Sequence, residues 1–277
     1  MADDPLVSVV ITTKNRITLL PRAVKSVLEQ TGPSLEVIVV DDGSDVPAAL
    51  DIQDPRLRFV RHEVSQGLTN ARNAGFRAAR GQFFCMLDDD DWYLPGKLEK
   101  QLAFLEANPE IDMVFSRVTV RDAEGKDRYY LPAEHVHSPE INLYAFNVIH
   151  PSSVLMRRKV FEQVPFEPRI KKYEDTLFFI RVTFTFKTAY LPMEVSVWMQ
   201  DGRPDQLTRV FYERNFVNFR IVCEGLADIL ERYPVARRKY YGRLAFQAAR
   251  CGRVWECAKA GAKALGLARG TRLAPAA

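Results

Sequence analysis

The chain has 277 residues, enough for one large domain or for a domain with an appendage. Hydrophobic residues make up 47% and charged residues 27%, with 14 glycines and 16 prolines, and this composition excludes collagen-like, disordered and low-complexity proteins. The formal net charge of +4 is too small to indicate a nucleic-acid partner, and we expect none.

Two features of the sequence indicate the cellular compartment of the protein. No apolar stretch approaches the ~20 residues that a bilayer-spanning helix needs, and the segment Met1–Pro5 is acidic where a secretory signal is basic. The four cysteines form no CxxC pair, which favours reduced, buried thiols: they are Cys85, Cys223, Cys251 and Cys257. We therefore expect a cytoplasmic protein.

The first 90 residues alternate between strand and helix patterns. Apolar, β-branched runs predict strands, and apolar residues at helical spacing predict helices. In chain order, we expect a strand over 6–12, a helix over 19–28, strands over 35–40 and 56–61, a helix over 68–79 and a strand over 82–87. This alternation predicts right-handed βαβ units, hence an α/β fold with a mainly parallel sheet flanked by helices.

The rest of the chain is less regular. We expect a helix from Leu94–Pro95 to about Glu106, a strand over 112–120, connecting loops over 121–150, strands over 152–156 and 189–199, and a helix over about 174–186 between them. From Tyr212 onward the apolar spacing predicts helices, with breaks at Pro234 and Gly252. Loops on a rigid scaffold often carry function, so the 121–150 stretch is a candidate for binding an acceptor.

The second predicted strand ends in an acidic motif, Asp41-Asp42-Gly43-Ser44. Ligands of doubly wound α/β folds bind at the carboxyl edge of the sheet, where these side chains would lie. A carboxylate there can accept hydrogen bonds from a base or a ribose. Asp-Gly-Ser is equally ordinary turn chemistry, so both interpretations stay open at this point.

A run of four acids, Asp88-Asp89-Asp90-Asp91, follows the wholly apolar strand that ends at Leu87. Like charges packed at a strand end repel, so a compensating positive charge is needed. Mg²⁺ and Mn²⁺ prefer oxygen ligands, and Mg²⁺ typically takes one or two carboxylates while phosphate oxygens and water complete its shell. The run thus favours a metal and nucleoside diphosphate site. The alternative is a solvated loop that caps the next helix.

A third acidic motif, Glu174-Asp175, stands at the start of an apolar helix. It can act as an N-terminal cap that complements the helix dipole. It can also supply a general base, which needs a carboxylate within hydrogen-bond reach of an attacking hydroxyl. The residues alone leave both possibilities open.

Weaker candidates each have a plain structural alternative. They are His150 as a polar contact, Trp92 and Tyr93 as a sugar platform, and 205–209 as a source of a cation near a diphosphate. No GxGxxG follows the first strand, and no GxxxxGK[ST] or GxSxG occurs, so dinucleotide binding, a P-loop and a nucleophile elbow are unsupported.

Together these motifs resemble those of the family-2 glycosyltransferases of GT-A fold, a Rossmann-like α/β architecture. The resemblance extends from about Leu6 to Thr208 in the family's order and spacing. It rests on Val9-Val10-Ile11-Thr12-Thr13-Lys14-Asn15-Arg16, Val39-Val40-Asp41-Asp42-Gly43-Ser44, Asn70-Ala71-Arg72-Asn73-Ala74-Gly75, Leu87-Asp88-Asp89-Asp90-Asp91 and Tyr173-Glu174-Asp175.

The resemblance implies a metal-dependent, inverting, hexosyltransferase-type enzyme that moves a sugar from a nucleotide-sugar, a UDP-sugar, to a glycan or lipid-linked acceptor. It implies that Asp90 and Asp88 bind a divalent metal, Mn²⁺ or Mg²⁺. It also implies that Asp175 is the catalytic base and that Glu174 orients it. The positions implied to bind the nucleotide-sugar are Thr12, Asp41, Asp42, Arg72, Asp88 and Asp89.

The C-terminal part is strongly basic: from Arg232 to Ala277 eleven lysines and arginines face one acid, Glu256. We expect a catalytic domain over 1–211, with a nucleotide-binding half (1–120) and an acceptor half (121–211), and a helical basic segment over 212–277. Within it, we expect Tyr240 to Leu267 to form two short helices that pack on the catalytic domain as a hairpin. A secondary expectation is peripheral contact with the inner membrane face, because a basic surface attracts anionic lipid.

Two other functions are compatible with this pattern. A nucleotidyltransferase also gathers carboxylates around metals, but it would need a strongly basic triphosphate loop near the first strand, where only Lys14 and Arg16 stand. A catalytically silent binding or scaffold module would keep the fold, although it has no need for so many acids.

Overall fold

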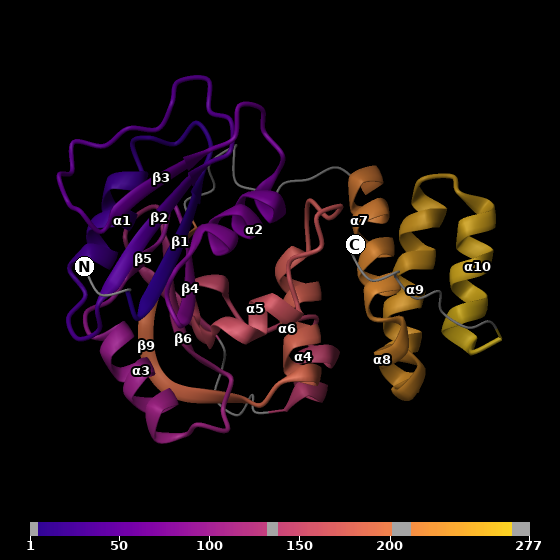
Figure 1. Cartoon of the computed structure of the whole chain (residues 1–277). Coiled ribbons are helices and arrows are strands. Elements are labelled where there is room, and N and C mark those ends of the chain that lie inside the picture. Colours follow the sequence, from indigo (N-terminus) through magenta and orange to yellow (C-terminus); the bar gives the residue numbers. More distant parts are fainter. Residues whose placement is uncertain (1–4, 132–137, 201–211, 268–277) are drawn as a thin grey trace.

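The computed structural model describes residues 5–131, 138–200 and 212–267. A nine-stranded mixed sheet forms its centre, in the order β3-β2-β1-β4-β8-β6-β9-β5, with β7 paired to β6 (Figure 1). The strands are β1 (Val7–Thr13), β2 (Leu35–Asp41), β3 (Leu57–Arg61), β4 (Phe83–Asp88), β5 (Trp92–Tyr93), β6 (Met113–Asp122), β7 (Asp127–Leu131), β8 (Val154–Arg157) and β9 (Thr188–Gln200). The expected α/β fold is confirmed.

Strands β3, β2, β1 and β4 are parallel neighbours, as the strand–helix alternation predicts. Strands β1 and β2 are buried at every position, which explains why their sequences are mostly apolar. Alternate side chains point to opposite faces, so Val9 and Ile11 join one core cluster and Val10 joins the other. The other half of the sheet is mixed, because β8 runs antiparallel to both β4 and β6.

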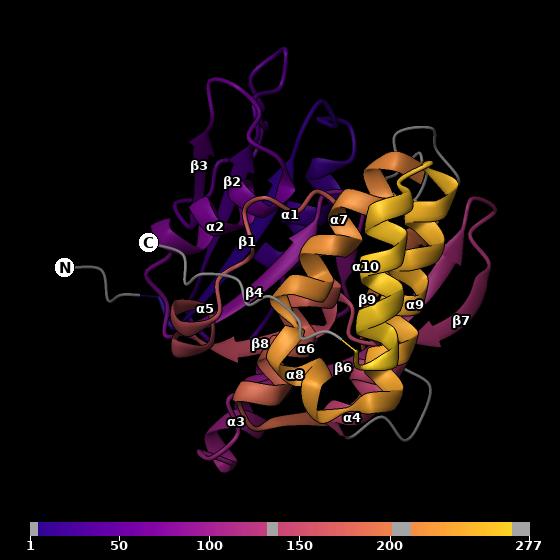
Figure 2. The same ribbon diagram turned by 90° about the vertical axis from the view of Figure 1, so that its right-hand side faces the viewer.

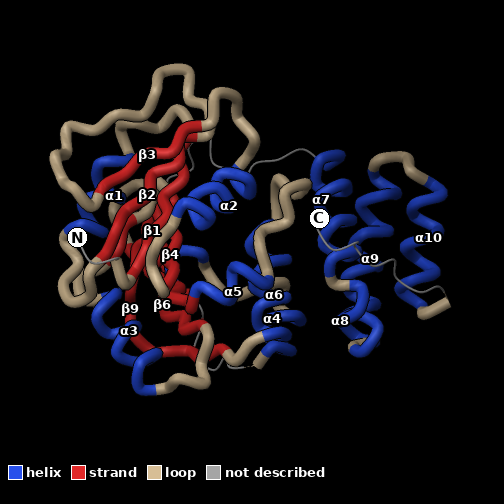
Figure 3. The backbone as a smooth tube through the Cα atoms, viewed as in Figure 1, coloured by secondary structure: helices blue, strands red, loops and turns tan. Residues whose placement is uncertain are grey.

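Helices cover both faces of the sheet (Figure 3). Helices α1 (Leu20–Leu28) and α3 (Lys97–Ala107) pack on one face, and α2 (Leu68–Ala78), α5 (Arg158–Gln163) and α6 (Glu174–Thr185) pack on the other. A short helix, α4 (Pro139–Tyr144), and one 3-10 turn, Pro151–Ser153, lie in the connection from β7 to β8.

Two stretches differ from the sequence-based expectation. Helix α3 begins three residues late because Trp92 and Tyr93 pair with β9 and the Leu94 amide donates to the Val195 carbonyl. The stretch 121–150 is also more regular than the expected loops. It contains β7, which returns along β6 after a turn at Gly125 (φ 80°), and α4, whose N-cap is Ser138.

Four helices, α7 (Tyr212–Gly225), α8 (Ala227–Arg232), α9 (Pro234–Arg250) and α10 (Val254–Leu265), form the C-terminal part (Figure 2). The breaks at Pro234 and Gly252 are confirmed. These helices share a hydrophobic cluster with Leu143, Leu177 and Ile180 of α4 and α6, and thus pack directly on the α/β part. The domain limits at 211 and 212 stay a prediction.

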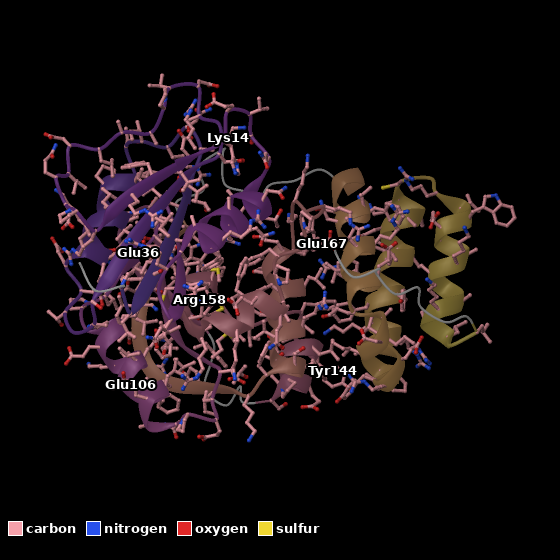
Figure 4. The ribbon with its side chains drawn as sticks, in the orientation of Figure 1. Lys14, Glu36, Glu106, Tyr144, Arg158 and Glu167 are labelled. Atoms are coloured by element: carbon pink, nitrogen blue, oxygen red, sulfur yellow. The ribbon has the colours of Figure 1, made fainter. Side chains whose placement is uncertain are left out.

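Hydrogen bonds reinforce this contact. The Tyr240 hydroxyl donates to the Leu143 carbonyl at 3.0 Å, and Lys239 Nζ donates to the Tyr144 carbonyl at 2.6 Å, where Figure 4 labels Tyr144 beside the C-terminal helices. All four cysteines are free. Within the described ranges, no helix combines the length and the apolar character needed to cross a membrane.

Candidate functional site

The carboxyl edge of the parallel strands gathers the predicted polar residues. The register places Thr12 opposite Asp88 and Thr13 opposite Asp41. Figure 4 labels Lys14 just beyond the end of β1 at this edge, while Glu106 lies at the other end of the molecule. The Thr13 hydroxyl donates to Asp89 Oδ2 at 2.7 Å, which links β1 to the acidic run after β4.

Asp41 and Asp42 organise the loops beyond β2. Asp41 accepts hydrogen bonds from the backbone amides of Ser44 and Ala48, both at 2.9 Å, and forms an ion pair with Arg61. Asp42 accepts four hydrogen bonds at 2.7–2.8 Å, from His62 Nδ1, Ser65 Oγ and the backbone amides of Gln66 and Gly67. Burial alone would raise the pKa of each carboxyl, but these bonds lower it overall.

The loops after β2 and β3 approach each other so closely that position 43 must be a glycine. Gly43 has φ +70°, and a Cβ built there would lie 2.5 Å from the Ser65 backbone nitrogen. The loop after β2 thus touches the loop after β3, and only glycine permits the approach. Asp42 and Gly43 together fix the segment 62–67 that leads into α2.

An arginine compensates two acids of the run after β4. Arg16 Nη1 lies 3.2 Å from Asp89 Oδ1 and 3.3 Å from Asp90 Oδ2. The sequence indicates that such a cation is needed but does not single out Arg16 for this role. Arg22 also donates to the Asp90 carbonyl at 2.7 Å. Burial raises the pKa of Asp89 to about 7 despite the bond from Thr13.

Asp91 plays a different part from the other three acids. It is fully buried, and its Oδ1 accepts a hydrogen bond from the Met199 amide of β9 at 3.1 Å. Its Oδ2 has no hydrogen-bond partner in the described part of the chain. Burial and the neighbouring Asp90 raise the pKa of Asp91 well above its usual range. Asp91 therefore joins the acidic run to β9 from a buried position.

Arg72 connects the acidic run to the start of α6. Its side chain is 1% exposed, and it donates to Asp88 Oδ1 at 2.7 Å and to Glu174 Oε1 at 3.1 Å. Arg72 stands near the middle of α2, on the buried face of the helix that packs on the sheet. Residues that are 86 positions apart in the chain, Asp88 and Glu174, thus share one buried cation.

Glu174 and Asp175 open α6 beneath this cation. Tyr173, with φ 68°, turns the chain into the helix. Asp175 Oδ1 accepts the Thr176 amide at 2.6 Å, and Oδ2 accepts a longer bond of 3.4 Å from Asn147 Nδ2. Burial and the neighbouring acid raise the pKa of Glu174 to about 7, and burial raises the pKa of Asp175 in the same direction.

The structure places the weaker candidate residues in different surroundings. Tyr93 is a core residue whose hydroxyl donates to the Met86 carbonyl, while Trp92 lies under the Arg22 guanidinium at 3.9 Å. Burial lowers the pKa of His150 to about 4, so the ring is neutral. Its Nδ1 accepts from the Ser152 amide, which places the proton on Nε2. The segment 205–209 lies outside the described residues.

The chemistry of the acids fits a divalent cation. Their oxygens are hard ligands, and the Asp88 and Asp90 side chains remain 31% and 13% exposed at the sheet edge. Within the described residues no group of three potential protein ligands is preformed. A metal here would therefore rely on one or two carboxylates and on oxygens of the bound diphosphate, and Arg16 would have to share Asp90 with it.

The acidic residues gather at the carboxyl edge of a partly parallel α/β sheet, which is where proteins of this class bind their ligands. The chain belongs to glycosyl transferase family 2, whose family model matches residues 8–165. Both the family and the GT-A architecture expected from the motifs are thereby confirmed.

Known relatives agree with this assignment. An uncharacterized glycosyltransferase of Methanocaldococcus jannaschii, MJ1057, is 32% identical over 189 residues, which cover 65% of each chain. The match thus spans just under two thirds of that relative's length.

Solved structures share the fold. S. aureus TarS 1–349, in complex with UDP-GlcNAc, superposes with a TM-score of 0.65 at 16% identity, covering 94% of this chain and 92% of that one. The mannosyltransferase PcManGT from Pyrobaculum calidifontis, in complex with GDP-Man and Mn²⁺, has a TM-score of 0.56 at 16% identity, covering 96% and 75%. At this identity the similarity establishes the architecture.

Proposed function

We propose that this protein is a metal-dependent, inverting glycosyltransferase of hexosyltransferase type, which transfers a sugar from a nucleotide-sugar, a UDP-sugar, to a glycan or lipid-linked acceptor. The observation that carries the proposal is the pair of ion pairs Asp88–Arg72–Glu174, built on the buried Arg72 guanidinium. It ties the acids suited to a metal diphosphate to the carboxylates suited to activating an acceptor, which is the arrangement that a direct sugar transfer requires.

On the donor side, Asp90 and Asp88 would hold a divalent metal, Mn²⁺ or Mg²⁺. When bound, the metal neutralises charge that develops on the leaving diphosphate. The Mn²⁺ in PcManGT supports this part of the proposal. Thr12 at the end of β1 and Asp89 beside it would contact the nucleotide-sugar.

Three further residues would help to bind the donor indirectly, by shaping or positioning its surroundings: Asp41, Asp42 and Arg72. The carboxylates of Asp41 and Asp42 already accept bonds from the loops at 44–48 and 62–67, so we assign them to shaping the walls around the nucleoside. Arg72 is enclosed by Asp88 and Glu174, so we assign it to positioning those two acids.

On the acceptor side, Asp175 is the better base of its pair. Glu174 is engaged by Arg72 at 3.1 Å, whereas within the described residues Asp175 Oδ2 accepts a long bond of 3.4 Å from Asn147. A carboxylate with a raised pKa takes a hydroxyl proton more readily near neutral pH. Asp175 would remove the acceptor's proton while Glu174 orients it. Attack from the face opposite the nucleotide then inverts the anomeric centre.

The alternative of a nucleotidyltransferase gains no support. Such an enzyme would need Arg16 for a triphosphate, but this guanidinium lies against Asp89 and Asp90.

Calorimetric titration with UDP, GDP, dTDP and CDP, with and without Mn²⁺, tests the proposal. We expect metal-dependent binding of UDP. Asp90→Ala should abolish that binding, while Asp175→Asn should bind UDP normally and lose sugar transfer. Absence of binding to all four diphosphates would instead favour a silent scaffold module, and equal loss of binding in both variants would refute the assigned roles.

A further inference from the structure

Helix α10 turns its large apolar side chains away from the protein. Trp255 is 81% exposed, Val254 74% and Leu265 66%, whereas the buried residues of the helix are Ala260 and Ala264. A surface helix ordinarily directs its large apolar residues to the core. In α10 this pattern is reversed, and small residues make the inward contact.

The inward contact fixes which way the helix faces. Ala260 and Ala264 join the C-terminal hydrophobic cluster, and Lys263 Nζ lies 5.6 Å from the centre of the Tyr241 ring of α9. At about 100° per residue, Val254, Trp255 and Leu265 share one arc of the helix, opposite the two buried alanines. Figures 1 and 2 show α10 as the outermost element, with no described element over its outer side.

Positive charge borders this apolar arc and dominates the C-terminal part. Lys259 is exposed next to Trp255 on the helix surface, whereas Arg253 turns inward over the Phe216 ring of α7. Across residues 232–267, nine lysines and arginines face the single acid Glu256. Two copies of the chain packed through this face would bring like charges together, whereas an anionic surface would be complementary. Exposed tryptophan beside lysine and arginine is also typical of helices that lie in a membrane interface.

We propose that the outer face of α10, formed by Val254, Trp255 and Leu265 and flanked by Lys259, docks on an anionic lipid bilayer. The helix would lie along the surface with its apolar arc at the boundary between headgroups and acyl chains. The transferase would then work beside lipid-borne acceptors. This docking uses no residue of the carboxyl-edge site and does not depend on the transfer reaction.

Vesicle co-sedimentation of the full chain tests the proposal. We expect binding to phosphatidylcholine vesicles that contain about 30% phosphatidylserine, weaker binding as salt rises, and little binding to phosphatidylcholine alone. Trp255→Ser should weaken partitioning about tenfold, because a large apolar side chain would no longer enter the interface. Lys259→Gln should weaken binding and reduce its dependence on salt.

A matched pair of valines provides the control. Val254→Ser removes a valine that is 74% exposed on α10, and Val46→Ser removes one that is 79% exposed in the connection between β2 and β3, on the far side of the sheet (Figure 1). The first should weaken vesicle binding and the second should not. Because all of these positions are exposed, the variants should fold normally.

Equal binding by wild type and Trp255→Ser would overturn the proposal. So would a concentration-dependent dimer, measured by analytical ultracentrifugation, that Trp255→Ser dissolves, since the face would then be a contact between copies. Asp175→Asn should bind vesicles like the wild type. Failure of vesicle binding would therefore leave the proposed transferase function untouched, and failure of transfer would leave the docking intact.

Discussion

Arg72 and Glu174 are separated by 102 positions in the chain, yet Arg72 Nη1 lies 3.1 Å from Glu174 Oε1. The same guanidinium binds Asp88 at 2.7 Å through its other terminal nitrogen. One buried cation therefore sets the position of two acidic motifs relative to each other.

Removing the Arg72 cation should lower the free energy of unfolding. Arg72→Met leaves Asp88 and Glu174 without their shared partner in a buried setting, and we expect unfolding free energy to fall by about 3 kcal/mol. Arg77→Met, on the exposed side of the same helix, should change it by less than about 0.5 kcal/mol. Urea denaturation measures both, and similar values for the two variants would contradict the role given to Arg72.

The proposed base should determine how transfer depends on pH. The raised pKa of Asp175 predicts that activity falls, as the pH drops, at a higher pH than an ordinary aspartate would give, because the base must be deprotonated to accept a proton. Asp175→Asn should reduce kcat by about 10²–10⁴-fold. A pH–rate profile with an acidic limb near 4 would contradict this assignment.

Glu174→Gln separates the two acids of the motif. The amide keeps a hydrogen bond to Arg72 but loses the charge, so we expect a smaller loss of kcat than in Asp175→Asn. Removal of the neighbouring charge should also lower the pKa of Asp175 and move the acidic limb to lower pH. A larger loss of kcat in Glu174→Gln would make Glu174 the base.

Asp42 should contribute to stability in a pH-dependent manner. Its pKa in the folded protein is lowered, so its contribution is complete above the unfolded value of about 3.9 and is lost as the pH falls through the folded value. In Asp42→Asn, the new amide N–H groups would face the amides of Gln66 and Gly67. We expect a loss of about 2 kcal/mol at pH 7 and a weaker decline of stability in acid.

Asp45 provides the comparison for this experiment. It is exposed and pairs with Asn15 at the surface, so Asp45→Asn should change the unfolding free energy by less than about 0.5 kcal/mol. Denaturant curves between pH 3 and 7 check both variants. Parallel pH profiles for wild type and Asp42→Asn would refute the proposed contribution.

Two glycines test the contact between the loops of the site. Gly43 and Gly67 both have positive φ, but a Cβ at Gly43 would lie 2.5 Å from the Ser65 nitrogen, while a Cβ at Gly67 would meet nothing within 4 Å. Gly67→Ala should therefore cost only the strain of its backbone conformation (φ 91°, ψ 160°), about 1–3 kcal/mol. Gly43→Ala should cost more and should weaken UDP binding as well. Equal costs in thermal unfolding would show that the loops separate easily.

Local patterns in the sequence determine the strands and the position of the acids. Val9 to Ile11 and Val37 to Val40 are continuous apolar runs, and such runs are stable only when a sheet is covered on both faces. Parallel strands joined by helices bring their carboxyl ends to one edge, so the motifs at Asp41 and Asp88 could be placed together before the structure was known.

Only the tertiary structure decides those features that depend on contacts between residues distant in the chain. The strand at Trp92–Tyr93 forms because it pairs with β9. Two residues are too few to show the alternating hydrophobic pattern from which a strand is predicted. The outward direction of Trp255 is likewise set by how Ala260 and Ala264 pack on α9, since an amphipathic pattern alone would turn the tryptophan inward. Arg16 and Arg72 belong here as well: a sequence shows that buried acids need a cation, but only the folded chain selects which one reaches them.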